Sequence, residues 1–453
     1  MFEFNQVMVI FSRLDEVLLS LLSLSLIFIY FMFPFNKYLL NSFLKSVNFN
    51  TIDALCINIV IHSFIFLIIS FFSINKFYFG ILIITLSIIT NLIFIKKNIS
   101  KKDSLILLIF FVFLMTYCFK LASFASLTWD GLSHWFYKTQ IFFQNGSISD
   151  FKKVPFPFYP HLGPYVWSFF WKLTNSEYEY LGRFFYIILF LSSCLCLSNR
   201  IKNYQLRIIF FVGIVFFLTE TTLFGGYQEY FIFSLITIFS SFYFFFNEEF
   251  KTNKIKFSLL FLCILSLLPW IKDEGLMCSI ILFFLIIVTN KYIIKEKLLF
   301  SILYLMGMIL NYYIELNVKD LVDFQFELKL NSLMFFIDNL NYIFSTFLYF
   351  LFEFIKSSIR FPIWIFIIIF TILIFKNGNN SEKKFVKTLT LIFFLYIFIL
   401  ITGYMMLFVD QEFNKEAMWH LKTSNYRLIL QVTGLFSVIV VKFLNINEQK
   451  FLK

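Results

Sequence analysis

The sequence predicts an all-α integral membrane protein, a polytopic bundle of about thirteen transmembrane helices with further helices at its outer face. Composition is the first observation behind this prediction: 60% of the residues are apolar, 14% are charged, and the mean hydropathy is +0.83. A soluble domain could not bury that much apolar surface. The second observation is that apolar runs of about 17 to 25 residues, the length of a membrane span, alternate with short basic segments.

The expected spans follow one another along the whole chain. Their approximate limits are 17–36, 54–74, 77–95, 104–122, 183–199, 208–224, 228–246, 256–271, 275–290, 298–315, 361–375, 388–409 and 426–443. A further apolar run at 339–356 is interrupted by Asn and Glu residues. We expect this run to form an interfacial or partly buried helix at the outer side.

Positive charge sets the expected orientation. Lys and Arg gather in five segments between apolar runs, at 96–102, 200–207, 247–256, 291–297 and 376–387. Such segments stay on the cytoplasmic side, which places loop 123–182 on the outer side. The formal net charge of +11 therefore reflects topology, and no nucleic-acid partner is expected. The six cysteines have neither metal-site nor disulfide spacing and are interpreted as small buried hydrophobic residues.

The longest outer loop, 123–182, has enough pattern to be structured. Apolar residues recur at intervals of three and four over 131–143, which predicts an amphipathic helix on the membrane surface with Asp130 as its N-cap. The proline-rich stretch 155–160 cannot be helical and is expected to be extended. A second interfacial helix, rich in Trp, is expected at 163–173.

Aromatic and polar residues gather on this outer side. All seven Trp residues and three of the four His residues fall in outer loops or at the outer ends of expected spans, although an interfacial Trp belt would populate both sides. The remaining outer polar residues lie in three short segments, 220–229, 270–274 and 410–427. Because ionisable groups near a bilayer are costly, we expect these segments to share one cavity with the long loop.

Five short motifs lie in these outer segments. They are WDGLSHW at 129–135 followed by Lys138, YPHLGP at 159–164, GYQE at 226–229, KDEG at 272–275, and His420 with Ser424 and Arg427. In this order they resemble the motifs of the bacterial GT-C glycosyltransferases, multi-span enzymes that take sugars from polyprenyl-phosphate carriers. The sequence departs from that pattern at Gln228 and Glu229, where the family has Ala and Asp, and at Asp273, where it has Asn.

The resemblance divides the chain into three parts. It covers residues 104–445, which would form a GT-C-like catalytic module that includes outer loop 123–182. Residues 1–103 look like an N-terminal addition of transmembrane helices, and 446–453 would form a cytoplasmic tail. The resemblance also implies a multi-pass protein of the bacterial inner (plasma) membrane with its active site on the outer face.

The activity implied by the resemblance is an inverting transfer of a hexose or pentose from a polyprenyl-phosphate donor to a glycan or lipid-linked acceptor. Asp130 would be the catalytic base, because an acceptor hydroxyl that attacks the anomeric carbon must lose its proton. Lys272 and Arg427 would bind the donor phosphate through their positive charges. The residues expected to bind substrate are His134, Trp135, Lys138, Tyr159, His161, Tyr227, Glu229, Lys272, Glu274, His420 and Arg427.

Each of these residues also has a structural explanation. Asp130 could cap a helix, and the two glutamates could do the same or bind substrate. Lys272 and Arg427 could extend to the membrane interface. The histidines could be interfacial hydrogen-bonding residues or zinc ligands, although they lack a close-spaced pair. The sequence establishes no cofactor, and a divalent metal ion is the open alternative.

Three other functions compete with sugar transfer as explanations of the sequence. An oligosaccharide polymerase or ligase also acts on lipid-linked glycans, but its key Arg and His residues would lie in one large late loop. A flippase or transporter of lipid-linked sugars would place ionisable residues and broken helices at mid-membrane, where this sequence has mainly His62, Asn91 and Asn311. A membrane protein without activity would leave the one-sided Trp and His distribution unexplained.

Overall fold

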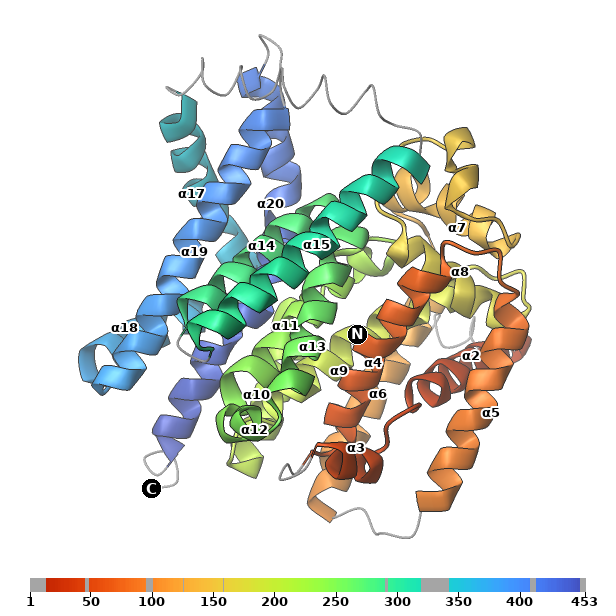
Figure 1. Ribbon diagram of the computed structural model, residues 1–453, viewed down its shortest axis with the longest axis horizontal. Helices are drawn as coiled ribbons and strands as arrows, with labels where there is room; N and C mark the ends of the chain where they lie inside the picture. Colours follow the sequence, from red (N-terminus) through yellow and green to blue (C-terminus); the bar gives the residue numbers. More distant parts are fainter. Residues whose placement is uncertain are drawn as a thin grey trace.

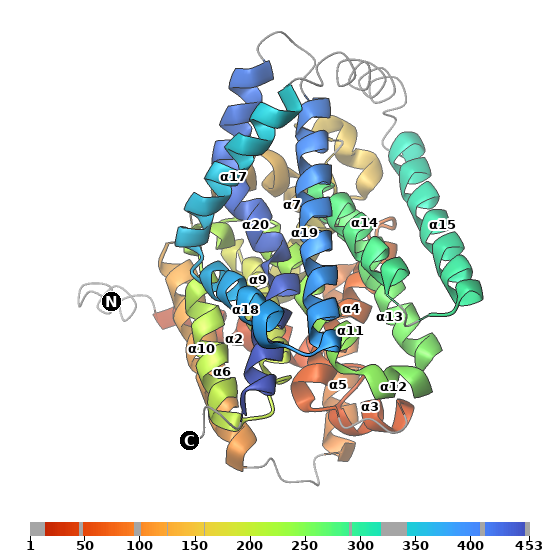
Figure 2. The ribbon, with the colours of Figure 1, turned by 90° about the vertical axis from the view of Figure 1, so that its left-hand side faces the viewer.

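The computed structural model describes residues 14–44, 49–94, 101–124, 126–157, 159–289, 292–318, 342–407 and 413–448 (Figures 1 and 2). Within these residues all regular structure is helical and no strand occurs, as the sequence predicts. Parts of several expected features lie outside the described residues, namely those at 95–100, 290–291, 339–341, 408–412 and 449–453.

The helices are numbered as in Figure 1. The N-terminal helices are α2 (Leu14–Phe31), α3 (Lys37–Phe43), α4 (Thr51–Ile69), α5 (Lys76–Phe94) and α6 (Lys101–Ser123). The long loop contains η1 (Gly131–Phe136), α7 (Tyr137–Phe143), η2 (Ile148–Lys153) and α8 (Leu162–Thr174). The middle of the chain forms α9 (Tyr180–Ser198), α10 (Tyr204–Leu218), η3 (Thr221–Phe224), α11 (Glu229–Phe245), α12 (Asn247–Thr252), α13 (Lys254–Leu267), η4 (Leu268–Trp270), α14 (Asp273–Val288) and α15 (Ile294–Val318). The last helices are α17 (Tyr342–Arg360), α18 (Ile363–Asn377), α19 (Asn380–Leu407) and α20 (Phe413–Ile446).

Seven of the described helices are long and apolar enough to cross a membrane. These candidate spans are Thr51–Ile69, Lys76–Ile93, Ser104–Ser123, Tyr180–Ser198, Ile294–Ile314, Asn380–Ile401 and Lys422–Ile446. Helices α10, α11 and α18 are apolar but shorter, so the structure supports fewer full-length spans than the sequence pattern predicts. The outward face of α15 exposes Leu298, Ile302 and Ile309, among other large apolar side chains, which fits a helix surrounded by lipid.

Helix α9 is the centre of the bundle. Every one of its residues from Tyr180 to Ser198 is buried, which is expected of a helix that is apolar on all sides. The N-terminal helices α2, α4 and α6 pack on it from one side, and α8, α10 and α11 cover the rest. Helix α20 lies along α11 and joins the C-terminal helices to this centre.

Two polar residues inside the apolar helix α4 hold the end of α2. Asn58 donates to the carbonyls of Phe31 (2.9 Å) and Phe35 (2.8 Å), and His62 Nε2 lies 2.6 Å from the carbonyl oxygen of Phe33. The last carbonyls of a helix have no partner within it, so these side chains satisfy groups that lipid could not. The polar character of this part of α4 therefore has a local structural cause.

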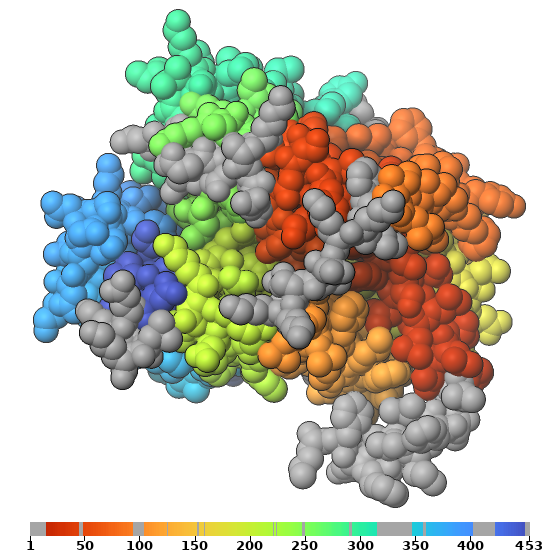
Figure 3. Space-filling model, turned by 90° about the horizontal axis from the view of Figure 1, so that it is seen from below, coloured from red at the N-terminus to blue at the C-terminus, as the bar shows by residue number. Residues whose placement is uncertain are grey.

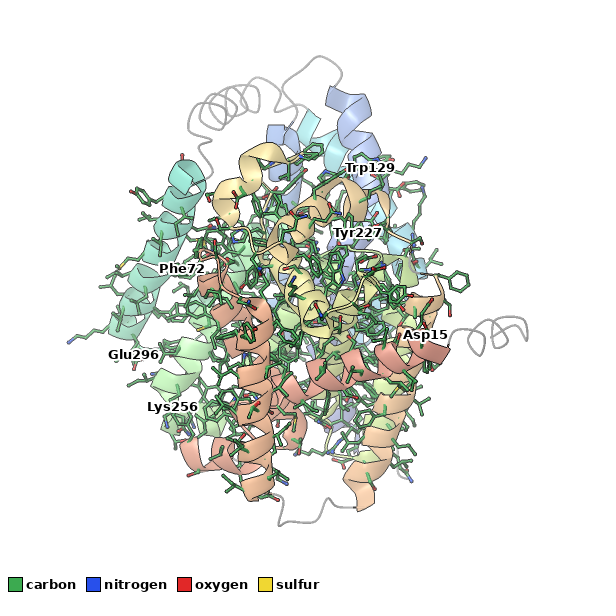
Figure 4. All side chains as sticks on the ribbon, turned by 90° about the vertical axis from the view of Figure 1, so that its right-hand side faces the viewer. Asp15, Phe72, Trp129, Tyr227, Lys256 and Glu296 are labelled. Atoms are coloured by element: carbon green, nitrogen blue, oxygen red, sulfur yellow. The ribbon has the colours of Figure 1, made fainter. Side chains whose placement is uncertain are left out.

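The two ends of the bundle differ in charge. Helix α7 lies at the upper end in Figure 1 and α12 at the lower end, and we call these the α7 end and the α12 end. Figure 4 shows Trp129 near the α7 end and Lys256 near the α12 end. The basic segments around 200–207 and 251–256 lie at the α12 end, opposite the long loop, as the charge pattern predicts. The start of α15 adjoins the second of them through the ion pair of Glu296 with Lys254.

A closed ion pair lies inside the α12 end. Arg200, just after α9, pairs with Asp53 of α4, and their side chains are 7% and 1% exposed. Arg200 Nε also donates to Ser241 Oγ at 2.7 Å, and Asp53 accepts from the backbone nitrogen of Asn50 at 3.2 Å. The pair thus joins α4, α9 and α11. Figure 3 shows the N-terminal helices packed against the middle of the chain at this end.

The expectation that 163–173 forms an interfacial helix is wrong. Helix α8 does form there, but eleven of its residues are buried against α9, α7 and α5. Its two Trp residues, Trp167 and Trp171, are 0% and 7% exposed, and their indole nitrogens donate to backbone carbonyls. Of the Trp side chains that the structure describes, only Trp129 is exposed. Trp167 and Trp171 are core residues because their apolar area is buried and their N–H groups are satisfied inside the protein.

The helix predicted at 131–143 is present, but the face that it buries in the protein is not the apolar face that the sequence predicts. Its buried side chains include His134, Trp135, Lys138 and Phe142, whereas Leu132 is 49% exposed. The helical turns from Gly131 to Phe136 are π-helical, a local widening that often occurs at functional sites. The apolar pattern alone did not reveal this face because two of its members are ionisable.

Candidate active site

Three glycines bring the long loop against the start of α11. The backbone nitrogen of Thr128 donates to the carbonyl of Gly225 at 3.0 Å, and a Cβ at Gly131 would lie only 2.2 Å from that same oxygen. Gly226 has a φ of 102°, which a residue with a side chain rarely adopts. These contacts place Asp130, on the loop, close to Glu229, the first residue of α11.

A fully buried arginine fixes this junction. Arg183 of α9 donates to the carbonyls of Ser126 (3.3 Å) and Phe224 (3.2 Å), one on each side of the junction. Its charge is balanced by Glu179, whose Oε1 lies 2.8 Å from Nη2. Burial raises the pKa of Glu179 and Arg183 opposes that rise. This role was not predictable from the sequence, because Arg183 stands at the edge of an apolar run, where basic residues are common.

Five charged residues from four separate segments meet at the α7 end, and we call them the charge cluster. They are Asp130, Glu229, Lys272, Glu274 and Arg427. Arg427 of α20 is hydrogen-bonded to Asp130, although the two residues are 297 positions apart. Its Nη1 also lies 3.5 Å from Glu229 Oε1, and its Nη2 donates to Ser424 at 3.1 Å. The expected convergence of the outer segments is therefore confirmed for these residues.

Lys272 completes the cluster from the start of α14. Its Nζ donates to Glu229 Oε1 at 2.8 Å and lies 3.1 Å from Glu274 Oε1. Burial alone would lower the pKa of Lys272, but these two carboxylates raise it above its ordinary value, so the ammonium stays charged. Glu229 is the common partner, since one of its oxygens contacts both cations.

The cluster is unevenly exposed and unevenly charged. The Glu229 side chain is 0% exposed, whereas those of Asp130 and Glu274 are each 21% exposed. Three carboxylates face two cations, which leaves one negative charge in excess. Glu229 Oε2 and Arg427 Nε are buried and have no hydrogen-bond partner among the described residues. Buried polar atoms of this kind are usually satisfied, which makes the cluster a candidate for ligand binding.

Asp130 does not cap the helix, contrary to its expected position. The helix already begins at Trp129, and Asp130 has helical backbone angles and makes no capping hydrogen bond. Its carboxylate turns instead to Arg427. The structural explanation of this residue as an N-cap is therefore wrong, because the hydroxyl of Thr128 accepts from the backbone nitrogen of Gly131 at 3.3 Å and caps the helix instead.

Aromatic rings form one side of the cluster. The guanidinium carbon of Arg427 lies 4.6 Å from the ring centre of Tyr227. The ring of His134 stacks on Phe156 with centroids 4.3 Å apart and meets the rings of Trp129 and Tyr159 at 5.2 and 4.8 Å. Trp129, next to Asp130 in the chain, is 70% exposed. Its ring is thus open to a ligand that approaches Asp130.

Two of these rings titrate outside the neutral range. Burial lowers the pKa of His134, despite the nearby carboxylate of Asp130, so its imidazole is neutral at pH 7. Burial and the carboxylates of Asp273 and Glu274 raise the pKa of Tyr159 to about 12. Both side chains can therefore offer neutral hydrogen-bonding groups beside the charged ones.

Three further residues expected to bind substrate are buried beside the cluster. Lys138 is 0% exposed, donates to the carbonyl of Tyr159 at 2.6 Å and lies over the ring of Trp135, which is 2% exposed. His161, also 0% exposed, has its Nε2 2.9 Å from the Ser70 hydroxyl of α4. In this conformation all three hold the loop in place and present no surface to a ligand.

The last expected residue, His420, lies in α20, but its side chain is outside the described part of the chain. The structure adds a neighbouring ion pair that the sequence did not suggest. Arg360, at the end of α17, contacts Glu220 at 2.5 Å and stacks over the ring of Tyr426 at 3.9 Å. Among the described residues, no group of three or more His, Cys, Asp and Glu side chains is arranged to hold a metal ion.

Comparisons with protein-family models, with curated proteins and with solved structures found no match to this chain.

Proposed function

We propose that this protein is a membrane glycosyltransferase that moves a sugar from a polyprenyl-phosphate donor to a glycan or lipid-linked acceptor. The observation that carries the proposal is the charge cluster, in which the carboxylate of Asp130 and the cations Lys272 and Arg427 meet at one end of the bundle. Such a transfer needs a base for the acceptor and cations for the departing phosphate, and these are the groups that meet.

In the proposed reaction the acceptor oxygen attacks the anomeric carbon of the donor sugar. Its proton passes to Asp130 as the new carbon–oxygen bond forms. The bond between the anomeric carbon and the phosphate oxygen breaks, and the electron pair stays on the phosphate. Arg427, with its planar pair of donors, and Lys272 stabilise that charge. Attack from the face opposite the phosphate inverts the anomeric centre.

The exposed ring of Trp129 is proposed to bind a sugar. It adjoins Asp130 and is 70% exposed, in contrast to the other described Trp side chains. An aromatic face packs well against the C–H groups of a pyranose, while the neutral His134 and Tyr159 can hydrogen-bond to its hydroxyls. His134 and Tyr159 are therefore proposed to bind substrate.

We place the protein in the bacterial inner membrane with the charge cluster on the outer face. This placement rests on the basic segments at the opposite, α12 end of the bundle. It puts the cluster where polyprenyl-linked sugars are used for the cell envelope. One observation favours transfer over transport: His62 and Asn58, two polar residues inside α4, are occupied by backbone carbonyls at the end of α2.

The test is sugar transfer by the purified full-length protein in lipid vesicles. Polyprenyl-phosphate donors carrying different labelled hexoses and pentoses are supplied with a lipid extract as acceptor. We expect one donor to yield a labelled glycolipid or glycan whose new linkage has the inverted anomeric configuration by NMR. Absence of transfer from every donor, by protein that is folded and correctly inserted, would reject the proposed activity.

A further inference from the structure

The cations of the charge cluster are already occupied before any ligand binds. Arg427 is hydrogen-bonded to Asp130, and Lys272 contacts both Glu229 and Glu274. A phosphate can therefore reach a cation only by displacing a carboxylate from it. If the displaced carboxylate is that of Asp130, the proposed base is released from its cation.

The geometry separates fixed partners from exchangeable ones. Glu229 is 0% exposed and contacts both cations, at 2.8 Å and 3.5 Å, so it cannot leave without uncovering two buried charges. Asp130 and Glu274 are each 21% exposed, and each contacts only one cation of the cluster. An anion that enters from the exposed side meets these two carboxylates first.

We propose that the donor phosphate displaces Asp130 from Arg427, so that donor binding itself frees the carboxylate that serves as the base. The inference rests on the proposed function and adds to it an order of events. Without donor, the carboxylate of Asp130 is hydrogen-bonded to the guanidinium of Arg427. With donor, it has lost a cation and gained an anionic neighbour, and both changes favour its taking a proton.

The charge count supports this exchange. The cluster has one negative charge in excess, and a phosphodiester adds a second. Transfer of the acceptor proton to Asp130 removes one of these charges at the moment when the leaving phosphate gains one. When the phosphate departs, Asp130 releases its proton to water and pairs with Arg427 again. Donor and acceptor would thus act in order, and the donor-free protein would hold no free base.

The experiment measures binding of farnesyl phosphate to the full chain in detergent, by titration calorimetry. Asp130→Asn removes the carboxylate that competes for Arg427, so the dissociation constant should fall by about 3- to 10-fold. Glu220→Gln is the matched control, because Glu220 is 20% exposed and pairs with Arg360 outside the cluster. It makes the same charge change and should alter binding by less than about 2-fold. Equal or weaker binding by Asp130→Asn would overturn the exchange.

A double-mutant cycle shows whether the effect acts through Arg427. In an Arg427→Gln background, Asp130→Asn should no longer tighten binding, since the cation they compete for is gone. Persistent tightening would also overturn the exchange. If Asp130→Asn does not fold, carbodiimide labelling of the wild-type chain replaces it. Farnesyl phosphate should then speed labelling of Asp130 several-fold and leave Glu229 unlabelled, whereas slower labelling of Asp130 would contradict the proposal.

The outcomes separate this inference from the proposed function. Tightened binding by Asp130→Asn, together with no sugar transfer by the wild-type protein, would support the phosphate exchange and reject glycosyl transfer. Sugar transfer by wild type together with unchanged binding by Asp130→Asn would support glycosyl transfer and reject the exchange.

Discussion

The two ends of this protein each contain an arginine paired with an aspartate, and the pairs differ in every other respect. Asp53 and Arg200 at the α12 end are nearly unexposed, and their further hydrogen-bond partners include Ser241 of α11 and the backbone of Asn50, just before α4. Asp130 and Arg427 at the α7 end are 21% and 10% exposed. They belong to a cluster with one negative charge in excess and with buried polar atoms that have no hydrogen-bond partner among the described residues. The first pair is complete without a ligand. The second is a candidate for ligand binding, because its cluster keeps buried polar atoms that no described residue satisfies.

The buried pair at the α12 end maintains the fold, whereas the partly exposed pair at the α7 end can exchange partners. A buried pair with all its partners present contributes to the choice of one helix arrangement, and removal of either member leaves an uncompensated charge. A partly exposed cluster can exchange partners at lower cost. Mutations in the two pairs should therefore affect different quantities, stability at the α12 end and turnover at the α7 end.

The largest expected effect is the loss of turnover in Asp130→Asn. The substitution keeps the size of the side chain and removes the proposed base, so sugar transfer should fall by about 10² to 10⁴. Because Asp130 does not cap its helix, the variant should accumulate and unfold like the wild type. The measurements are the vesicle transfer assay and thermal unfolding in detergent. Full activity of folded Asp130→Asn would move the base to Glu274 or Glu229.

Asp53→Asn at the α12 end should lower stability and leave the specific activity unchanged. It leaves Arg200 buried without its carboxylate, so the free energy of unfolding should fall by about 3 kcal/mol. The folded fraction should keep its specific transfer activity, because Asp53 lies at the far end of the bundle from the charge cluster. Chemical unfolding followed by tryptophan fluorescence, with activity per folded molecule, provides the check. A stable but inactive Asp53→Asn protein would contradict the division of roles.

How far the sequence could predict this structure is clearest at the charge cluster. The segregation of basic segments and of outer motifs was enough to predict that Asp130, Lys272 and Arg427 lie at one end. The pairing of Asp130 with Arg427 was not predictable, because residues 297 positions apart meet only through the packing of α11 against α20. Which carboxylate is buried likewise depends on that packing.

Other features could not be predicted because Trp and Arg occur both at membrane interfaces and in protein interiors. Trp at the edge of an apolar run suits a membrane interface and a protein interior equally well, so α8 was expected at the surface although it is buried. Arg183 stands at the edge of an apolar run, where basic residues commonly mark the end of a membrane span. In the structure it instead holds the junction between the long loop and α11 from inside the protein. Thirteen spans were expected, whereas seven described helices have the full length of a span. Apolar runs of 14 to 17 residues also form the shorter helices α10, α11, α13, α14 and α18.

Lys272→Ala should produce an intermediate effect within the cluster. Loss of a charged contact to the donor phosphate should raise the apparent KM for the donor by about 10- to 100-fold, because this contact already exists in the ground state. Lys256→Ala, which removes a lysine at the α12 end, is the control and should leave the KM for the donor unchanged. Initial rates at varied donor concentration give the KM and kcat of both variants. A loss confined to kcat would assign Lys272 to the transition state instead of donor binding.

The smallest expected effect is that of Trp129→Ala, and it tests whether the exposed ring near the cluster binds sugar or merely touches lipid. Loss of one stacking surface should raise the KM for the acceptor by about 2- to 10-fold, with no change in unfolding, since the ring is 70% exposed. Trp129→Phe keeps an aromatic face and should recover most of the affinity. Trp135→Ala, at a ring that is 2% exposed, should instead destabilise the protein by about 3 kcal/mol or more. If Trp129→Ala leaves the KM unchanged and Trp129→Phe does the same, the ring is an interfacial residue, and the sugar must bind elsewhere on the α7 end.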